Sequence, residues 1–335
     1  MSGLKVLVLL VSMAMTMSMP TDQESVEWEK FKALYKKSYQ PEEEWIRRLI
    51  WAKNVEKVRK HNKETDMGLH TFSLGINEHS DTVRPRHGIN TAVNGFDEAV
   101  YRSPNFNYEM KADAEVNDLP KEVNWKTKGW VTPVGNQFQC GSCWAFTANS
   151  AVEGQHFNVT GQLIPLSAQN LMDCSQAEGN HGCEGGMMTY SYEYIIKNKG
   201  VDTQASYPYT GKNGGKCQFQ KKKVGATLTG YGTIQKGSEL ALQKAVATIG
   251  PIAVAVDGAN ESFELYKSGI LDVKNCKQTV DHSLLVVGYG TLNGTDYWLM
   301  KNSWGTSWGM DGYIMMSRNK GNQCGVANIG SFPIA

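Results

Sequence analysis

The first 139 residues of this 335-residue chain contain no cysteine. All seven cysteines follow, at positions 140, 143, 174, 183, 217, 276 and 324. The chain therefore divides into a cysteine-free front and a cysteine-bearing rear, and we expect these parts to have different fates. The sequence also has no excess of charge of either sign, with 34 basic and 33 acidic residues. This balance argues against binding to nucleic acid or to a membrane surface through a basic patch.

Long apolar runs are scarce, and no segment after the N-terminus approaches the 18 apolar residues of a membrane span. The N-terminus has one lysine, an apolar run of about ten residues from Val6 and then small residues. This layout is typical of a secretory signal peptide, expected over residues 1–17. The sequons at Asn158, Asn260 and Asn293 are glycosylation candidates and fit a secretory route, ending in the lysosome or outside the cell.

A helical pattern precedes the cysteine-bearing part. Six residues spaced 4, 3, 3, 4 and 4 apart share one helix face: Glu44, Arg48, Trp51, Asn54, Val58 and Asn62. Between about residues 82 and 118 the sequence is rich in Pro, Asn and Gly, which indicates an extended connector. From Leu119 onward the composition is typical of a compact domain.

The rear of the chain has helical patterns first and strand patterns afterwards. We expect a helix from Cys143 to about Asn158, with Ser142 as its cap, and two more over residues 167–174 and 186–198. Strands are predicted over residues 251–257, 283–289, 297–301 and 312–317. This order predicts an α+β fold with two packed halves, one mainly helical and one mainly antiparallel sheet.

The segment CGSCW places two cysteines three positions apart, and three interpretations are open. A thioredoxin-like redox pair has its tryptophan before the first cysteine, whereas Trp144 follows the second. A zinc site is conceivable from the spacing of Cys140, Cys143, Cys174, His181 or Cys183, but an oxidising compartment favours disulfides. The third interpretation uses the odd count: six cysteines form three bridges and one thiol stays free.

Cys143 has a chemical reason to be the free thiol. At the first turn of a helix the oriented amides favour the thiolate, and a nearby imidazolium favours it further. A nucleophilic thiolate needs a base, and the base needs an orienting group. His282 opens an apolar strand 139 residues after Cys143, and Asn302 follows 20 residues later in the segment KNSWG. Each residue alone fits a structural role, but together with CGSCW they indicate a catalytic set.

This combination resembles the papain family of cysteine proteases, and within it the cathepsin L-like branch. The resemblance rests on CGSCW and on PVGNQ, GCEGGMM, SYPY, VVGYG, KNSWGTSWGMDGY and QCGVAN, and the stripe from Glu44 to Asn62 matches the prosegment helix of that branch. It implies a papain-like fold, with a mainly helical half, an antiparallel β-barrel-like half and a cleft between them. A signal peptide (1–17), an inhibitory helical prosegment (18–113) and a mature peptidase domain (114–335) are expected.

The resemblance also implies a role for each site residue. Cys143 is the nucleophile, His282 the general acid and base, and Asn302 orients the imidazole under the shield of Trp304. Gln137 and the Cys143 amide form the oxyanion hole. The implied disulfides are Cys140–Cys183, Cys174–Cys217 and Cys276–Cys324. The reaction is peptide-bond hydrolysis through a thioester, without metal or cofactor.

Substrate contacts follow from the same resemblance. Gly185 and Gly186 let a substrate backbone approach closely, with Asp281 and Trp304 nearby. The pocket for the second residue before the scissile bond is expected to be lined by Met187, Met188, Ala255, Val280, Ser283 and Ile329. It contains no charge, so we expect an apolar preference. Because Ile329 replaces a usually small residue, we expect Leu or Val to be favoured over Phe.

Four departures from the family pattern lie at sites of interest: His79 in the prosegment, Phe138 beside Gln137, Glu184 before Gly185, and Ser283 after His282. They leave a second hypothesis open, a catalytically weak relative that works as a binding protein. We expect a monomer whose partners are protein or peptide substrates, its own prosegment as inhibitor, and cystatin-type inhibitors.

Overall fold

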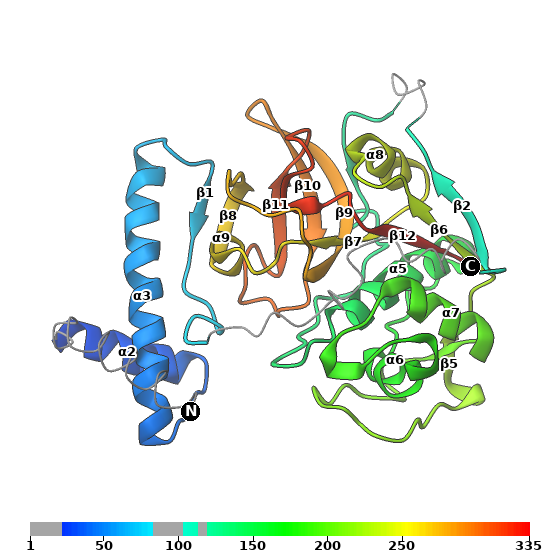
Figure 1. Cartoon of the computed structure of the whole chain (residues 1–335), viewed down its shortest axis with the longest axis horizontal. Helices are drawn as coiled ribbons and strands as arrows, with labels where there is room; N and C mark the ends of the chain where they lie inside the picture. Colours follow the sequence, from blue (N-terminus) through cyan, green and yellow to red (C-terminus); the bar gives the residue numbers. More distant parts are fainter. Residues whose placement is uncertain (1–21, 83–102, 113–118) are drawn as a thin grey trace, which may run out of the picture. The chain divides into compact units, whose positions relative to one another are not determined.

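The computed structural model describes residues 22–82, 103–112 and 119–335. The predicted signal peptide and most of the predicted connector lie outside the described residues. The chain divides into two compact units, Met1–Glu56 with Ser80–Val83, and Lys57–His79 with Arg84–Ala335. Helix α3 (Pro41–Asp66), drawn in Figure 1, contributes residues to both units.

The first unit is built around aromatic side chains from two helices, α2 (Asp22–Leu34) and α3 (Pro41–Asp66). Trp28, Phe31 and Trp51 are buried. The ring centroid of Trp51 lies 5.4 Å from that of Trp28 and 5.9 Å from that of Phe31. Burial of large aromatic rings is the main source of stability for so small a unit.

The stripe predicted on α3 is the face through which the helix makes its contacts. Trp51 is 3% exposed. Asn54 Nδ2 donates a hydrogen bond to the Ser80 carbonyl at 2.8 Å. Asn62 bonds both backbone groups of Leu74, each at 2.9 Å. The polar members of the stripe are therefore pairing groups that fix the chain leaving the helix.

The second unit contains a ten-stranded sheet with the order β1-β8-β11-β10-β9-β7-β12-β6-β2, and β3 pairs with β9 outside this path. Most pairs are antiparallel, while β8 with β11 and β2 with β6 are parallel. The strands are β1 (Phe72–Leu74), β2 (Phe106–Met110), β3 (Val123–Asn124), β6 (Gly230–Ile234), β7 (Ile252–Val256), β8 (Tyr266–Leu271), β9 (His282–Leu292), β10 (Thr295–Lys301), β11 (Tyr313–Ser317) and β12 (Gly330–Ile334). The two ends of the path, β1 and β2, come from the expected prosegment.

Helices and short strands complete this unit. They are α5 (Cys143–Thr160), α6 (Ala168–Cys174), α7 (Met188–Asn198), α8 (Glu239–Thr248), α9 (Glu261–Glu264), β4 (Val201–Asp202) and β5 (Val224–Ala226). One core cluster is centred on the sheet, and a second lies around α5, α6 and α7. Mixed helix and sheet in this arrangement confirms the predicted α+β class.

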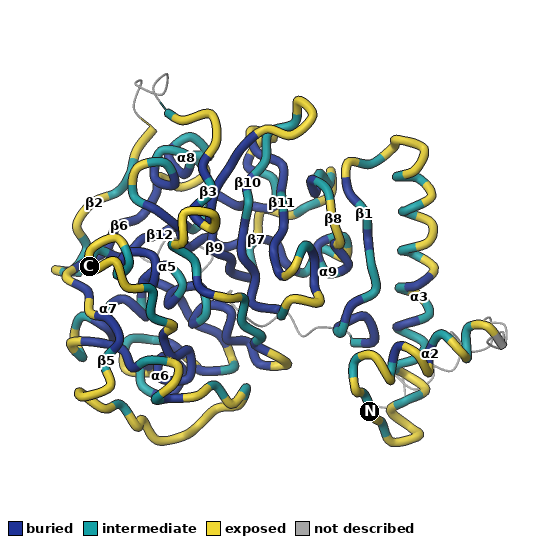
Figure 2. The backbone as a smooth tube through the Cα atoms, turned by 180° about the vertical axis from the view of Figure 1, so that it is seen from behind, coloured by how far each residue is buried: buried dark blue, intermediate teal, exposed yellow. Residues whose placement is uncertain are grey.

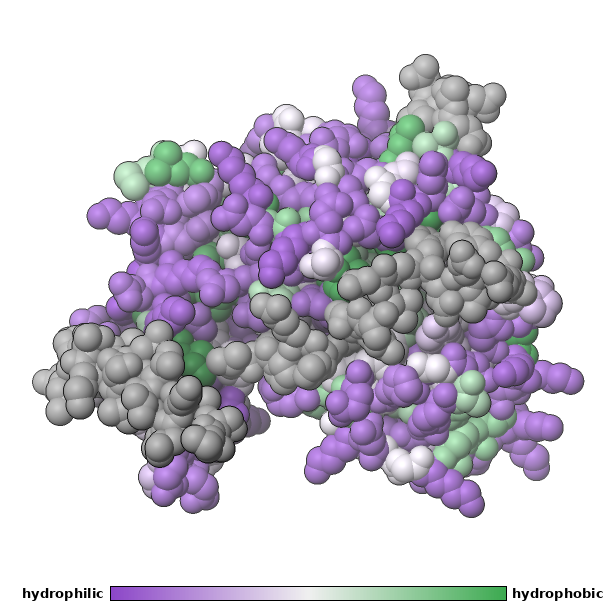
Figure 3. Space-filling view, in the orientation of Figure 1, coloured by the Kyte–Doolittle hydropathy of each residue, from purple (hydrophilic) through white to green (hydrophobic). Residues whose placement is uncertain are grey.

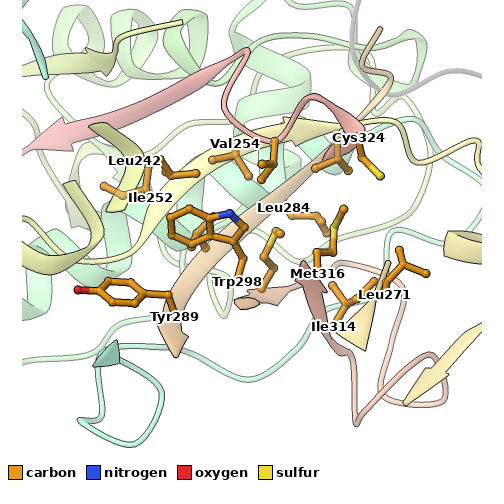
Figure 4. Packing of buried hydrophobic residues seen from close by; sticks show 14 of the residues in the cluster. Leu242, Ile252, Val254, Leu271, Leu284, Tyr289, Trp298, Ile314, Met316 and Cys324 are labelled. Atoms are coloured by element: carbon orange, nitrogen blue, oxygen red, sulfur yellow. The ribbon is translucent and has the colours of Figure 1, made fainter. Parts of the chain in front are cut away.

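The sheet core is densely filled. Trp298 of β10 is fully buried among side chains of other strands, including Val254, Leu284 and Ile314 (Figure 4). Strands β7 and β9 are buried along most of their length (Figure 2). By contrast, the surface seen in Figure 3 is mainly hydrophilic, with small scattered apolar groups. None of the helices in the described part of the chain combines the length and apolarity that crossing a membrane requires.

Three disulfides join the cysteine pairs that the resemblance implies: Cys140–Cys183, Cys174–Cys217 and Cys276–Cys324. The remaining cysteine, Cys143, is free.

Ser142 was predicted to cap α5, but its side chain does not make the capping hydrogen bond. Its hydroxyl instead lies 2.7 Å from the Tyr209 hydroxyl.

Candidate active site

The free thiol of Cys143 lies at the first residue of α5 and is 0% exposed. Burial raises the pKa of the Cys143 thiol to about 11, while hydrogen bonds with Ser283 and the amide of Trp144 lower it. Burial thus acts against the thiolate that the start of the helix is expected to favour. Removal from solvent disfavours the anion more strongly than the oriented amides favour it.

His282 is held at the start of β9. It pairs with Val256 of the neighbouring strand β7 and is 5% exposed. Its Nε2 lies 2.8 Å from Asn302 Oδ1. This bond fixes the ring orientation and leaves Nδ1 for proton exchange.

Trp304 covers this pair. It is 2% exposed, and its ring centroid lies 4.6 Å from that of His282. Phe263 supports the indole edge-on at 5.4 Å. The histidine–asparagine bond is therefore formed in an apolar, water-poor environment, where such bonds are stronger.

Gln137 is positioned by a residue that sequence reasoning missed. Ser303 Oγ donates to Gln137 Oε1 at 2.7 Å, and Gln137 Nε2 donates to the Cys140 carbonyl at 2.8 Å. The Ser303 amide also donates to Asn302 Oδ1 at 2.7 Å. Ser303 thus links the amide donor to the histidine–asparagine pair, and its place within KNSWG was the only signal for it.

A groove is lined by Gln137, His282 and Trp304, and its lining also carries acidic side chains. Within the described ranges, no lysine or arginine lines it. The lining residues are Gln137, Phe138, Gln139, Cys140, Gly141, Cys183, Glu184, Gly258, Ala259, Glu264, Asp281, His282 and Trp304.

Asp281, in the lining of the groove, is bonded to the backbone of a nearby loop. Its Oδ1 accepts hydrogen bonds from the amides of Gly258 at 2.7 Å and Ala259 at 3.2 Å. A Cβ on Gly258 would lie 2.4 Å from that of His282. Asp281 therefore holds a glycine loop against the catalytic candidate.

An apolar cluster contains four of the predicted pocket residues. Met187 is 7% exposed and Ala255 is 0% exposed. Val280, Ile329 and Tyr190 pack against them, and Tyr190 was not predicted. The other two predicted residues, Met188 and Ser283, are both fully buried, and Ser283 pairs with Ala255 between β9 and β7. Met188 belongs to the core around α5, to which Ile329 also contributes.

The conformation and packing of the chain itself favour glycine at positions 185 and 186. Gly185 has a φ of +110°, which disfavours other residues. A Cβ on Gly186 would lie 2.4 Å from Asn180 Oδ1 and 2.7 Å from the Trp144 ring. Packing within the chain, which the sequence did not indicate, therefore excludes a side chain at Gly186.

Phe138, Ser283 and Glu184, the other three departures from the family pattern, differ in their exposure and contacts. Phe138 adopts a φ of +52°, is 57% exposed and stacks on Tyr209 at 6.3 Å. Ser283 Oγ donates to Thr147 Oγ1 at 3.1 Å, so this buried hydroxyl is satisfied. Glu184 is exposed in the lining of the groove.

His79, the departure in the prosegment, lies near Trp304. Its ring centroid is 5.8 Å from that of Trp304, and its Nε2 lies 3.1 Å from Glu78 Oε1. Asn136 Nδ2 donates to the same Glu78 oxygen at 2.7 Å. Residues Glu78 and His79 of the expected prosegment thus lie beside the tryptophan that covers His282.

A thiol at a helix start, a histidine–asparagine pair and an amide donor are the parts of a cysteine hydrolase. Comparisons with known proteins give the particular family. The profile described as "Papain family cysteine protease" matches residues 119–334, and "Cathepsin propeptide inhibitor domain (I29)" matches residues 28–84. The chain belongs to the papain family of cysteine proteases and is a cathepsin L-like enzyme made as a proenzyme.

Several relatives span almost the whole chain. It is 44% identical to the cathepsin L-like peptidase of Aedes aegypti, over 99% of this chain and 100% of that protein. It is 46% identical to cathepsin S of Bos taurus, over 91% of each. Among solved structures, digestive procathepsin L 3 of Tenebrio molitor larval midgut has a TM-score of 0.82 at 37% identity, over 94% of this chain and 100% of that one.

Proposed function

We propose that Cys143, His282, Asn302 and Gln137 carry out peptide-bond hydrolysis in this enzyme. The observation that carries the proposal is the 2.8 Å bond from His282 Nε2 to Asn302, made one residue before Ser283, which hydrogen-bonds to the free thiol of Cys143. An imidazolium at His282 lowers the cost of ionising the buried thiol. Cys143 then transfers its proton to His282 Nδ1 and becomes the nucleophile.

The chemical steps follow from this pairing. The thiolate sulfur attacks the carbonyl carbon of the scissile bond, and the carbonyl oxygen becomes an oxyanion. His282 then returns its proton to the leaving amine as the C–N bond breaks, which leaves a thioester on Cys143. Water gives a proton to His282 and attacks the thioester, and the thiolate leaves as the carboxylic acid product forms.

Gln137 supplies the side-chain donor for the oxyanion. One hydrogen of its Nε2 is used by the Cys140 carbonyl, and the second is directed to substrate. The Cys143 backbone amide is the other donor. Because Ser303 holds the Gln137 oxygen, the donor needs no reorganisation when the charge develops.

We further propose an apolar preference for the second residue before the scissile bond. The apolar cluster of Met187, Tyr190, Ala255, Val280 and Ile329 supports this assignment. Ile329 narrows the pocket, so Leu or Val is favoured over Phe. Gly185, Gly186, Asp281 and Trp304 flank the bound peptide.

The route of the protein is proposed to be secretory, ending in the lysosome or outside the cell. Asn158 and Asn293 are exposed and are the more accessible glycosylation candidates, whereas Asn260 is half-buried and caps α9. The mature enzyme is proposed to act as a monomer open to cystatin-type inhibitors.

Active-site titration tests the proposal. The acid-processed protein is treated with an epoxide that alkylates papain-like thiolates, and the modified peptide is mapped by mass spectrometry. We expect stoichiometric labelling at Cys143, lost in Cys143→Ala. A processed protein with three intact disulfides and no labelling would favour the binding-protein hypothesis, with Phe138 or Ser283 disabling the site.

A further inference from the structure

A second cluster of chemically reactive side chains lies at the end of α3, outside the groove. It consists of His61, Glu64 and His70. One ligand atom from each of them lies within 4.8 Å of the other two. All three side chains are half-buried. The catalytic proposal uses none of them.

The sequence builds this cluster through the helix terminus. His61 and Glu64 are three residues apart on α3 and therefore share a face. The helix then ends in a tight reversal, with Leu69 N bonded to the Glu64 carbonyl at 3.0 Å and Gly68 N to that of Thr65 at 2.8 Å. Gly68 has a φ of +77°, as this type of helix ending requires.

The reversal brings His70 back over the helix. Its Nε2 lies 2.9 Å from Glu64 Oε2. Its ring stacks on that of His61, with centroids 4.1 Å apart and an angle of 11° between the planes. An imidazole nitrogen and a carboxylate oxygen at this separation match two ligands of one metal ion, which would replace the shared proton.

His61 has the supporting contact expected of a metal ligand. Its Nε2 lies 3.1 Å from the Phe72 carbonyl. In the tautomer that donates this bond, Nδ1 keeps its lone pair. Metal-binding histidines commonly donate their other ring nitrogen to a backbone carbonyl in this way. Thr65 Oγ1 donates to the same carbonyl at 2.8 Å, so the acceptor is itself fixed.

We propose that His61, Glu64 and His70 form a zinc-binding site in the prosegment. Two imidazoles and one carboxylate are a ligand set that zinc accepts, with water as the fourth ligand. Of the two lysines in the preceding turn of α3, Lys57 is paired with Glu261, while Lys60 acts electrostatically on Glu64.

The site has a structural consequence for the proenzyme. His70 lies just before β1 (Phe72–Leu74), which pairs with β8 of the catalytic sheet. Thr71 Oγ1 also donates to the Ile270 carbonyl at 2.6 Å. Zinc bound to His61 and His70 ties the end of α3 to this strand. We therefore expect zinc to slow the release of the prosegment strand.

Zinc titration of the full-length proenzyme tests the proposal. The Cys143→Ala background removes the catalytic thiol as a competing ligand. We expect calorimetry at pH 7.5 to give one zinc per chain, and Co²⁺ to give the absorption of a tetrahedral site. Both His70→Asn and Glu64→Gln should weaken zinc binding at least tenfold. His181→Asn, a change at an exposed histidine elsewhere, should leave binding unchanged.

A second readout separates metal binding from misfolding. Without zinc, each variant should keep the melting temperature of the Cys143→Ala parent within a few degrees, and added zinc should raise it only in the parent and in His181→Asn. The proposal is overturned if the parent binds no stoichiometric zinc. It is equally overturned if folded His70→Asn and Glu64→Gln proteins bind zinc as the parent does.

Discussion

At the scale of single residues, Gln137 is the group whose role can be isolated most cleanly. Replacing Gln137 by alanine removes the proposed side-chain oxyanion donor and leaves Cys143 and His282 in place. We expect kcat/KM of the mature enzyme to fall about 10²–10³-fold, mainly through kcat, because the donor acts on charge present only in the transition state. Steady-state kinetics on a fluorogenic peptide measure this.

Ser303→Ala is the matched control for this prediction. It removes the bond to Gln137 Oε1 but keeps the bond from Gln137 Nε2 to the Cys140 carbonyl. We expect a smaller loss of kcat than in Gln137→Ala. Full kcat in Gln137→Ala would show that the oxyanion is bound elsewhere.

Ile329 is a second residue with a separable effect. Ile329→Ala removes branched volume from the apolar cluster that contains Met187 and Ala255. We expect the ratio of kcat/KM for Phe over Leu, as second residue before the scissile bond, to rise about tenfold, the usual order for a change of pocket size. Leu292→Ala, at an exposed hairpin position, should leave the ratio unchanged. An unaltered ratio in Ile329→Ala would show that Ile329 does not line the pocket for this substrate residue.

Residue types and spacing were enough to single out His282 and Asn302, because CGSCW and KNSWG occur together. They did not reveal Ser303 or Tyr190 as contributors, since each acts through a contact with a residue far away in sequence. Nor did they reveal the burial of Cys143, which decides its pKa. A pattern can identify a group, but the surroundings that set its properties come from long-range packing.

At the scale of elements, α5 and β10 are joined by a buried polar chain. Lys301 Nζ, at the end of β10, donates to Thr132 Oγ1 at 2.9 Å, and Thr132 donates to Glu153 of α5 at 2.6 Å. Burial raises the pKa of the Glu153 carboxyl and lowers the pKa of the Lys301 ammonium. Each group therefore depends on the other to remain charged.

Lys301→Met should destabilise the fold by about 3–5 kcal/mol at pH 7, because it leaves Glu153 buried without its counter-charge. The deficit should shrink as the pH falls to 5. A carboxyl with a raised pKa in the folded state binds its proton more readily than the unfolded chain does, so its contribution is present at low pH and lost as the pH rises. Urea unfolding of the Cys143→Ala proenzyme measures this.

The double variant Lys301→Met/Glu153→Gln is the control for the pair. The glutamine removes the buried charge and still accepts the hydrogen bond that Leu166 N makes to Glu153 Oε1. We expect it to recover most of the stability lost in Lys301→Met. A pH-independent deficit, or no recovery, would mean that the loss comes from packing alone.

Helices and strands with a clear local sequence pattern were predicted, whereas those with a weak pattern were not. β9 and α5 were predicted because apolar runs and helical spacing mark them clearly. β6 (Gly230–Ile234) and β12 (Gly330–Ile334) were not, because glycine and proline weaken the strand pattern. Their pairing through residues 230–234 and 330–334 supplies the stability that local propensity lacks.

At the scale of the whole molecule, strands of the expected prosegment are part of the catalytic sheet. β1 pairs with β8, and β2 pairs with β6. Strand addition of this kind binds through backbone hydrogen bonds and gains specificity from side chains in pockets. Phe72 of β1 supplies such a side chain, since it is 3% exposed within the sheet core. The prosegment therefore contributes to the stability of the sheet that it covers.

Phe72→Ala should loosen this attachment in the proenzyme by about 3–5 kcal/mol, the usual cost of truncating a buried phenylalanine. We expect faster acid processing, followed by densitometry of the mature band. The kcat/KM of the processed enzyme should be unchanged, because residue 72 leaves with the prosegment. Leu69→Ala, at a position 65% exposed, is the matched control and should process at the parent rate. Equal rates for Phe72→Ala and Leu69→Ala would mean that prosegment release is limited elsewhere than at β1.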